Sequence, residues 1–439
     1  FLSVTISILT CFSFAAEAVA ADEAVTPSPA VAEQKPAAAP EKPLKIKPFV
    51  LKSEDGLASI KFGLAVQMVY ESTWTKVEDE GPHSNYITFK HIQPGISGNL
   101  FTPDFTYKFS FEMVPGKIDV VDAFVDYSFH THAQLRLGST YVGFTRLRMN
   151  SWTNQALVDF SIGPKYFGSE RQVGLTLHNG LDKPGEHEYE FGIYTGAPSR
   201  PSYDAGLAKV SKEKMLQPMI LSEDNDDIDK IHPELVGHYA YNYNGIDVTT
   251  ETDWEKTNFR CSAGLGLSYD PRPEAYRDFA MRTGLELMMK AYGWSFLTTF
   301  WTGFYDKSDE YGSPEVDGNF NYAMLGLVLQ SGYLIERYLE IVMRYSHVNV
   351  GSDYRKDVQA RTQAILDGAA DEAELAELES AYKGAGVLEN DNELSLGING
   401  YPLGKHLKLT SDVSLLWQEK VAADTKHDVR LRLLMQMTF

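Results

Sequence analysis

Cysteine is nearly absent from this chain of 439 residues, which contains only Cys11 and Cys261. Cys11 lies within an apolar stretch at the start of the chain that we expect to be cleaved off, so a single thiol would remain. A fold held together by internal disulfides, the usual solution of small secreted domains, is therefore excluded.

Long hydrophobic runs are also scarce, and the only one lies at the beginning. Residues 1–16 are largely apolar and uncharged, and Ala18, Val19 and Ala20 form the small-x-small pattern that signal peptidase accepts. The run is short for a transmembrane helix, which needs roughly 20 apolar residues. We expect residues 1–20 to be a signal peptide, with an uncleaved anchor as the alternative.

Positive charge and catalytic motifs are in short supply. The chain has 40 Lys and Arg against 60 Asp and Glu, a formal net charge of -20, which disfavours nucleic acid as a partner. There is no Gly-rich phosphate loop and no Gly-x-Ser-x-Gly elbow, and the histidines lack metal-ligand spacing. We expect no enzyme, no cofactor and no metal.

Residues 21–56 are rich in Ala and Pro. The prolines from Pro27 to Pro48 follow one another too closely for a helix or a strand. We predict an extended periplasmic linker, with an arm that binds a partner or the cell wall as the alternative. The folded part would then begin at Leu57.

Beyond Ile60 the chain alternates between apolar and polar residues. The alternation is clearest in residues 60–71, 107–112, 121–128, 259–269 and 339–346. A period of two is that of strands with one apolar and one watery face. Aromatic residues are abundant, with 24 Tyr, 23 Phe and 6 Trp, as the girdles at two lipid interfaces require. A soluble β-sandwich would also alternate.

Two features favour a membrane barrel over the sandwich. Residues 429–439 form an alternating strand that ends in Phe439, which resembles the assembly signal of bacterial outer-membrane barrels. Long and short connections also alternate, as in barrels with long outer loops and tight periplasmic turns. We predict an all-β, transmembrane antiparallel β-barrel of about 16 strands over residues 57–439. Tight turns are predicted at 102–105, 130–132, 292–293, 336–337 and 401–405, and long loops at 143–171, 196–233, 306–320 and 348–391.

Two segments depart from the alternation. Residues 355–384 are rich in Ala, Glu and Leu at helical spacing, so we predict a helical insertion in an outer loop, either solvated or docked on a partner. Residues 294–305 are apolar or aromatic on both faces, and the pattern leaves open which face points outward.

Four blocks of residues 88–196 are similar, in order and spacing, to the phosphate-selective porin O and P family. They are FKHIQPGISGNL (89–100), DAFVDY (122–127), LRLG (135–138) and ERQVG (170–174). The resemblance implies a sixteen-stranded, homotrimeric channel whose third loop folds inward and narrows the pore. The family's phosphate-binding members carry arginines in the second-strand block, where this chain has Lys90, His91 and Gln93.

By this resemblance the third loop is residues 141–171. Its basic residues are Arg146, Arg148, Lys165 and Arg171. Arginines in a narrow throat of low dielectric constant replace part of an anion's hydration with charge-assisted hydrogen bonds. The remaining constriction candidates lie on inward strand positions and are Arg136, Lys90, Asp122, Asp126 and Glu112. We expect opposed basic and acidic walls with a transverse field, or, alternatively, solvated charges and cross-strand ion pairs.

These observations predict an outer-membrane porin for the passive diffusion of small hydrophilic solutes and ions. Its other partners would be outer-membrane lipid and lipopolysaccharide. One alternative is a channel selective for phosphate or another oxyanion. Another is a barrel that serves as a scaffold for a partner protein or anchors the cell wall. An outer-membrane hydrolase is disfavoured because no Ser/His pair stands out.

Overall fold

The computed structural model describes ten stretches of the chain. They are residues 49–76, 83–114, 117–169, 171–181, 184–195, 233–271, 280–305, 322–352, 387–421 and 425–439. The expected signal peptide, most of the expected linker and the predicted helix at 355–384 lie outside these residues.

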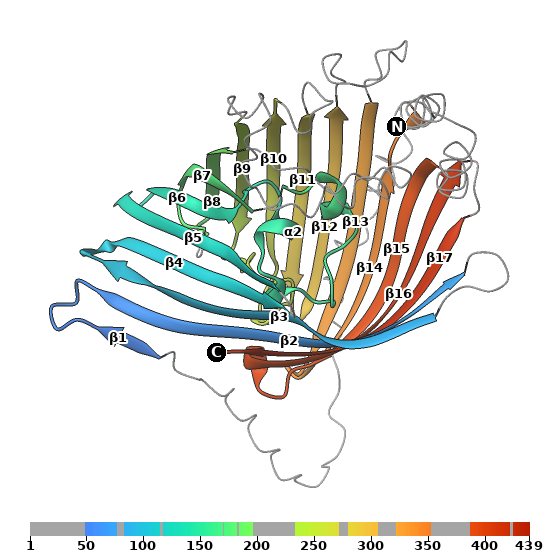
Figure 1. Ribbon diagram of the computed structural model, residues 1–439, viewed down its shortest axis with the longest axis horizontal. Helices are drawn as coiled ribbons and strands as arrows, with labels where there is room; N and C mark the ends of the chain where they lie inside the picture. Colours follow the sequence, from blue (N-terminus) through green and yellow to red (C-terminus); the bar gives the residue numbers. More distant parts are fainter. Residues whose placement is uncertain are drawn as a thin grey trace, which may run out of the picture. The chain divides into compact units, whose positions relative to one another are not determined.

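Sixteen antiparallel strands form a closed ring in the described part of the chain (Figure 1). They are β2 (Ser59–Lys76), β3 (His83–Leu100), β4 (Thr102–Val114), β5 (Lys117–His130), β6 (Ala133–Tyr141), β7 (Arg171–His178), β8 (His187–Tyr194), β9 (Glu234–Tyr243), β10 (Arg260–Asp270), β11 (Ala280–Ala291), β12 (Trp294–Tyr305), β13 (Tyr322–Ile335), β14 (Leu339–Asn349), β15 (Val387–Gly400), β16 (Leu407–Val421) and β17 (Lys426–Thr438). Each strand pairs with the next, and β17 pairs with β2, which closes the barrel. The predicted barrel of about 16 strands is confirmed.

A short additional strand, β1 (Val50–Lys52), pairs with the beginning of β2, where Val50 lies opposite Lys61. Paired structure therefore begins before Leu57, within the segment predicted to be a linker. The apolar residues that follow the run of prolines extend the sheet, because their backbone N–H groups are available for pairing.

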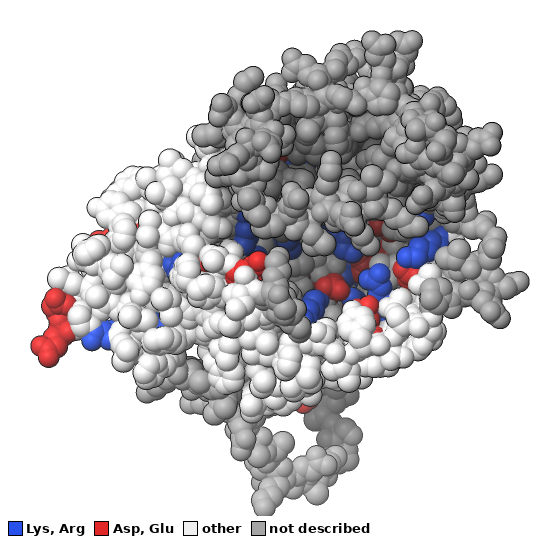
Figure 2. Space-filling model, in the orientation of Figure 1, with Lys and Arg blue, Asp and Glu red and all other residues white. Residues whose placement is uncertain are grey.

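The outer wall of the barrel is apolar and the inner wall is polar. On β10, Leu267 and Tyr269 are 45% and 44% exposed, whereas Ser268 and Asp270 are 2% and 1% exposed. Figure 2 shows the same division, with a mostly white outer wall and charged side chains gathered in the hollow. This is the reverse of a water-soluble protein and suits an outer surface in contact with hydrocarbon.

The predicted tight turns lie together at one end of the barrel, which we call the turn end. Those after β5, β11, β13 and β15 are confirmed. The turn between β3 and β4 lies at Phe101, one residue before the predicted segment, and an irregularity at the start of β4 accounts for the shift. The opposite end is the loop end. Within the described residues, no helix is long and apolar enough to cross a membrane.

Two connections fold into the barrel. L3, residues 142–170, joins β6 to β7 at the loop end and contains the short helices α2 (Arg146–Met149), η1 (Trp152–Asn154) and α3 (Gly163–Phe167). The β9–β10 connection, residues 244–259, enters from the turn end. Side chains of the inner wall bond to both connections, so the predicted inward fold of the third loop is confirmed.

Candidate functional site

Part of the inner wall is apolar, and L3 covers it. Phe144 and Phe167 of L3 belong to one buried cluster with Leu297 and Trp301 of β12. The rings of Trp301 and Phe167 are parallel, with centroids 5.8 Å apart. Burying each such side chain contributes about 1.5–3 kcal/mol. This packing settles the orientation of β12, whose inward aromatic residues lie against L3 and not against water.

Glycines on the inner wall let the backbone of L3 approach closely. A Cβ atom on Gly266 of β10 would lie 1.8 Å from the carbonyl oxygen of Phe144, and one on Gly284 of β11 would lie 2.3 Å from Cγ2 of Thr145. Neither position tolerates a side chain while L3 keeps its place. Inward glycines in otherwise regular strands are the sequence signal for such an approach.

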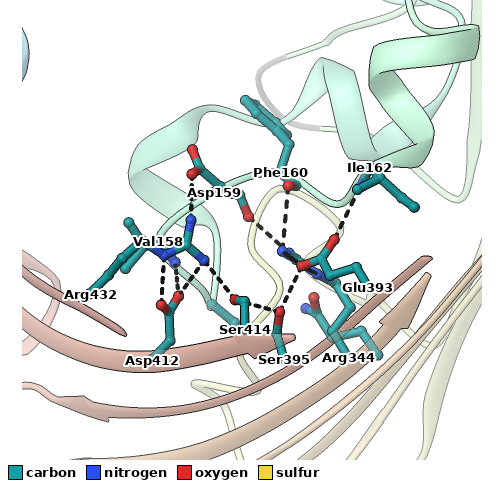
Figure 3. Close-up of polar contacts among 12 residues, drawn as sticks. Val158, Asp159, Phe160, Ile162, Arg344, Glu393, Ser395, Asp412, Ser414 and Arg432 are labelled. Carbon is teal, nitrogen blue, oxygen red and sulfur yellow. Dashed lines mark hydrogen bonds and ion pairs between the residues drawn. The ribbon is translucent and has the colours of Figure 1, made fainter. Parts of the chain in front are cut away.

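Charged side chains hold L3 on the other side of the barrel (Figure 3). Arg432 of β17 donates from Nε to Oδ1 of Asp412 on β16 at 2.7 Å, and its Nη1 lies 2.5 Å from Oδ2 of Asp159 in L3. Asp412 also accepts the backbone N–H of Val158 at 3.0 Å. One buried ion pair of the wall therefore fixes both the backbone and a side chain of the loop.

A second buried pair repeats this arrangement on the neighbouring strands. Arg344 of β14 donates to Glu393 of β15 at 2.5 Å, and Glu393 accepts the backbone N–H of Ile162 at 3.1 Å. Arg344 also donates to the carbonyl oxygens of Asp159 and Phe160, at 2.9 and 3.4 Å. Here opposite charges on neighbouring strands form cross-strand ion pairs, the second of the two arrangements considered for the inner wall, and the pairs bind L3.

The second-strand block of the family resemblance also binds L3. Lys90 pairs with Asp159 and donates to the carbonyl oxygen of Val158 at 2.6 Å. The next residue, His91, stacks on Trp152 at 4.5 Å. Consecutive side chains normally point to opposite faces of a strand, but the pairing of β2 with β3 shifts at this point, and such a bulge re-aims a side chain.

Charge compensation is strong at two positions of L3. Burial by itself raises the pKa of Asp159. The positive charges of Lys90 and Arg432 lower it by a larger amount, so the pKa lies below its usual range. Burial lowers the pKa of Arg146, and the carboxylates of Glu188 and Glu286 more than offset this effect. Both side chains are therefore charged at neutral pH.

L3 leaves a polar cavity of 320 Å³ between itself and the wall formed by β3 to β8. We call this cavity the eyelet. Its charged lining consists of Lys108, Arg136, Arg146 and Arg171 with Asp122 and Glu190. The rest of its rim includes Gln93, Tyr141 and Asn154. Basic side chains thus outnumber acidic ones along the eyelet, although the chain as a whole is acidic.

The eyelet charges are held by ion pairs. Asp122 accepts from Lys108 at 2.7 Å and from Nε of Arg171 at 3.0 Å. Arg146 donates through Nη2 to Glu188 at 2.6 Å. These ion pairs fix the positions of Arg146 and Arg171 on the eyelet.

The ring of Tyr141 orients Arg171 of the eyelet and Arg148 of L3. The guanidinium carbon of Arg171 lies 3.5 Å from the ring centroid, and that of Arg148 lies 5.4 Å away. Arg148 also lies 4.7 Å from the ring centroid of Phe160. Stacking of a guanidinium group on an aromatic face restricts its motion.

The candidates from the sequence thus fall into three groups. Arg136, Arg146, Arg171 and Asp122 line the eyelet together. Four others support it or L3: Asp126 pairs with Arg136 at 2.9 Å, Glu112 bonds to His91 at 3.0 Å, Arg148 packs on Tyr141, and Lys90 binds Asp159. Lys165 lies apart from the eyelet, on a separate cavity of 90 Å³.

Sequence reasoning missed the residues that hold L3 from β14 and β15. Neither Arg344 nor Glu393 stands out in the sequence, although both occupy inward, buried positions of alternating strands. A charged residue at an inward strand position is the sequence signal for such a contact, but nothing in the sequence shows which charged residues form ion pairs. Among the described residues, no cluster of His, Cys, Asp and Glu could hold a metal ion.

No protein-family model and no curated protein matches this chain. Solved structures do share its fold. The outer membrane channel DcaP of Acinetobacter baumannii matches with a TM-score of 0.56 at 13% identity, over 89% of this chain and 99% of that one. OprB of Pseudomonas putida matches with a TM-score of 0.52 at 10% identity, over 86% and 94% of the two chains. The chain has the fold of the outer-membrane porins.

Proposed function

We propose that this protein is a porin of the bacterial outer membrane, through which small hydrophilic solutes and ions diffuse. The observation that carries the proposal is the eyelet, a polar and charged cavity that L3 leaves open beside β3 to β8. The apolar outer wall suits lipid. In this proposal the loop end faces the external medium beside lipopolysaccharide, the turn end faces the periplasm, and residues 1–20 are the signal peptide.

The eyelet supports a moderate preference for anions. Lys108, Arg136, Arg146 and Arg171 line it against Asp122 and Glu190, and fixed charge in a narrow aqueous passage selects for counter-ions. A dedicated phosphate channel has less support, because Lys90, His91 and Gln93 contact L3 where the family's phosphate-binding members carry arginines. Membership of the phosphate-selective O and P family, and the homotrimer that it implies, remain part of the proposal.

Planar-bilayer recording of the purified, heat-modifiable barrel tests the function. We expect steady conductance and a reversal potential in a KCl gradient that indicates anion preference. Arg171→Gln and Arg146→Gln should each shift the reversal potential toward cation preference, because Asp122 or Glu188 loses its compensating charge. Lys165→Gln is the matched control and should leave it unchanged.

The same experiment separates the alternatives. A folded barrel that conducts no ions would contradict the porin proposal, and a stoichiometric partner that copurifies with it would then favour a scaffold. Strong anion selectivity that phosphate abolishes by blocking the current would favour the oxyanion channel. Equal reversal potentials for wild type and both arginine variants would show that the eyelet is not the constriction.

A further inference from the structure

We propose that the β9–β10 connection is a second element that sets the width of the pore, because it fixes the edge of the eyelet at Asn154 and Thr249 by holding L3 from the turn end. This inference rests on the proposed function. The connection, residues 244–259, is long for a turn at this end of the barrel. Its contacts give it a specific place in the lumen.

The wall holds the connection through one buried lysine. Nζ of Lys290 on β11 donates to three carbonyl oxygens of the connection, those of Asp247 at 2.6 Å, Thr250 at 2.7 Å and Thr252 at 3.2 Å. Lys290 is only 2% exposed. An ammonium group has three N–H donors, so this set of bonds uses all of them and fixes the backbone of residues 247–252.

An aspartate of the connection adds a second attachment. Asp253 accepts from Nη2 of Arg260 at 2.5 Å and from the backbone N–H of Gly293 at 2.7 Å. Asp253 is 1% exposed. The attachments by Lys290 and Asp253 together give the connection a defined conformation inside the barrel, as a fixed feature of the fold.

L3 in turn bonds to the connection through two asparagine side chains and one backbone carbonyl. Asn150 and Asn154 of L3 donate from Nδ2 to the carbonyl oxygens of Val248 and Thr249, both at 2.9 Å. The backbone N–H of Glu251 donates to the carbonyl oxygen of Asn154 at 3.2 Å. A loop that enters from one end of the barrel is thus hydrogen-bonded to a connection that enters from the other.

Glu251 links this contact to the barrel wall. Its Oε2 accepts the backbone N–H of Ala156 in L3 at 2.8 Å and Nε2 of Gln330 on β13 at 2.7 Å. Thr249 and Asn154 both line the eyelet. The position of this edge of the eyelet therefore depends on the connection. Release of the connection from the wall should widen the pore, although no charge of the eyelet is altered.

The test removes the lysine attachment and keeps the apolar stem. We expect Lys290→Met to raise single-channel conductance and current noise relative to wild type. Lys256→Met is the matched control, because Lys256 lies in the same connection but donates to Leu334 at the turn end, at 2.9 Å. Its conductance should equal that of wild type. A Lys290→Met channel indistinguishable from wild type would overturn the proposal, as would an equal rise in Lys256→Met.

Variants on the L3 side keep the test independent of how well Lys290→Met folds. Replacing Asn150 and Asn154 together with Ala should raise conductance in the same direction. The effects of this pair and of Lys290→Met should be less than additive, because both release the same contact. Full additivity would mean that the connection and L3 act separately, which contradicts the proposal.

A chemical readout needs no conductance. Val248 is 1% exposed, so a thiol introduced as Val248→Cys, with Cys261→Ser in the background, should resist a water-soluble maleimide. The added Lys290→Met change should make it react quickly, and Lys256→Met should not. Protection that persists in Lys290→Met would overturn this proposal while leaving the porin function intact. Absent conductance with the expected labelling would instead contradict the porin function alone.

Discussion

Trp301 of β12 and Phe167 of L3 stack ring on ring inside the barrel, with their planes 2° apart. Both side chains are 0% exposed. A strand that faces a watery pore has no need of a buried tryptophan, so this part of the lumen is a dry core. L3 is therefore part of the folded barrel, because its apolar side chains share one buried cluster with the wall.

We expect Trp301→Ala to lower the stability of the folded barrel by about 3–5 kcal/mol, because the change leaves a cavity between β12 and L3. The loosened loop should also increase current noise. Urea unfolding followed by electrophoretic mobility measures the first effect, and bilayer recording measures the second.

Trp294 provides the matched control for that experiment. It lies at the beginning of the same strand and is 57% exposed on the outer wall. Trp294→Ala should leave conductance and current noise unchanged. Equal noise in both variants would mean that the stacking with Phe167 does not hold L3.

Gly266→Val should displace L3 without altering any charge. The added Cβ would overlap the carbonyl oxygen of Phe144, since the two atoms would lie 1.8 Å apart, so the loop must move. We expect altered conductance in a barrel that still shifts its mobility on heating. The control is Gly400→Ala. The nearest atom to the added Cβ lies 4.0 Å away, so this variant should conduct normally. Gly245→Val is unsuitable as a control, because the φ of 68° at this position is itself unfavourable for valine.

Arg432→Met should cost about 3–5 kcal/mol, because it leaves the buried carboxylate of Asp412 without its partner. Arg430→Met, two residues earlier on the same strand, is the control. Arg430 is more exposed than Arg432, and its guanidinium lies 3.8 Å from Asp428, too far for a hydrogen bond, so its loss should cost less. Chemical unfolding of the two variants in detergent measures the difference, and similar losses would show that the bonds of Arg432 to Asp412 and Asp159 add nothing.

The contribution of Asp159 should persist in mild acid. Its pKa lies below its usual range because Lys90 and Arg432 outweigh the effect of burial. A lowered pKa in the folded state means that the stabilisation is complete above the unfolded pKa and is lost only as the pH falls through the folded one. The stability gap between wild type and Asp159→Asn should therefore stay constant from pH 7 to about 4. A gap that closes near pH 5 would contradict this assignment.

Alternation was enough to predict the barrel, its strand number and most of its tight turns, because the side-chain period of a strand depends on the chain alone. The position of Lys90 could not be predicted from the alternation. It was expected to be a pore residue on a regular strand, but a shift in the pairing of β2 with β3 brings it to L3. A bulge changes which face a side chain occupies, and the sequence carries little signal for it.

The sequence by itself therefore determined a closed barrel with an apolar exterior and a charged interior, and it marked the loop that narrows the pore. Only the tertiary structure decided which charges pair, where L3 rests and that the β9–β10 connection meets it. Local periodicity sets the direction of each side chain. Arg432 bonds to Asp159, and Lys290 bonds to Thr250, only after distant segments of the chain close around one lumen. Contacts between residues far apart in the chain depend on that closure, and no local pattern records them.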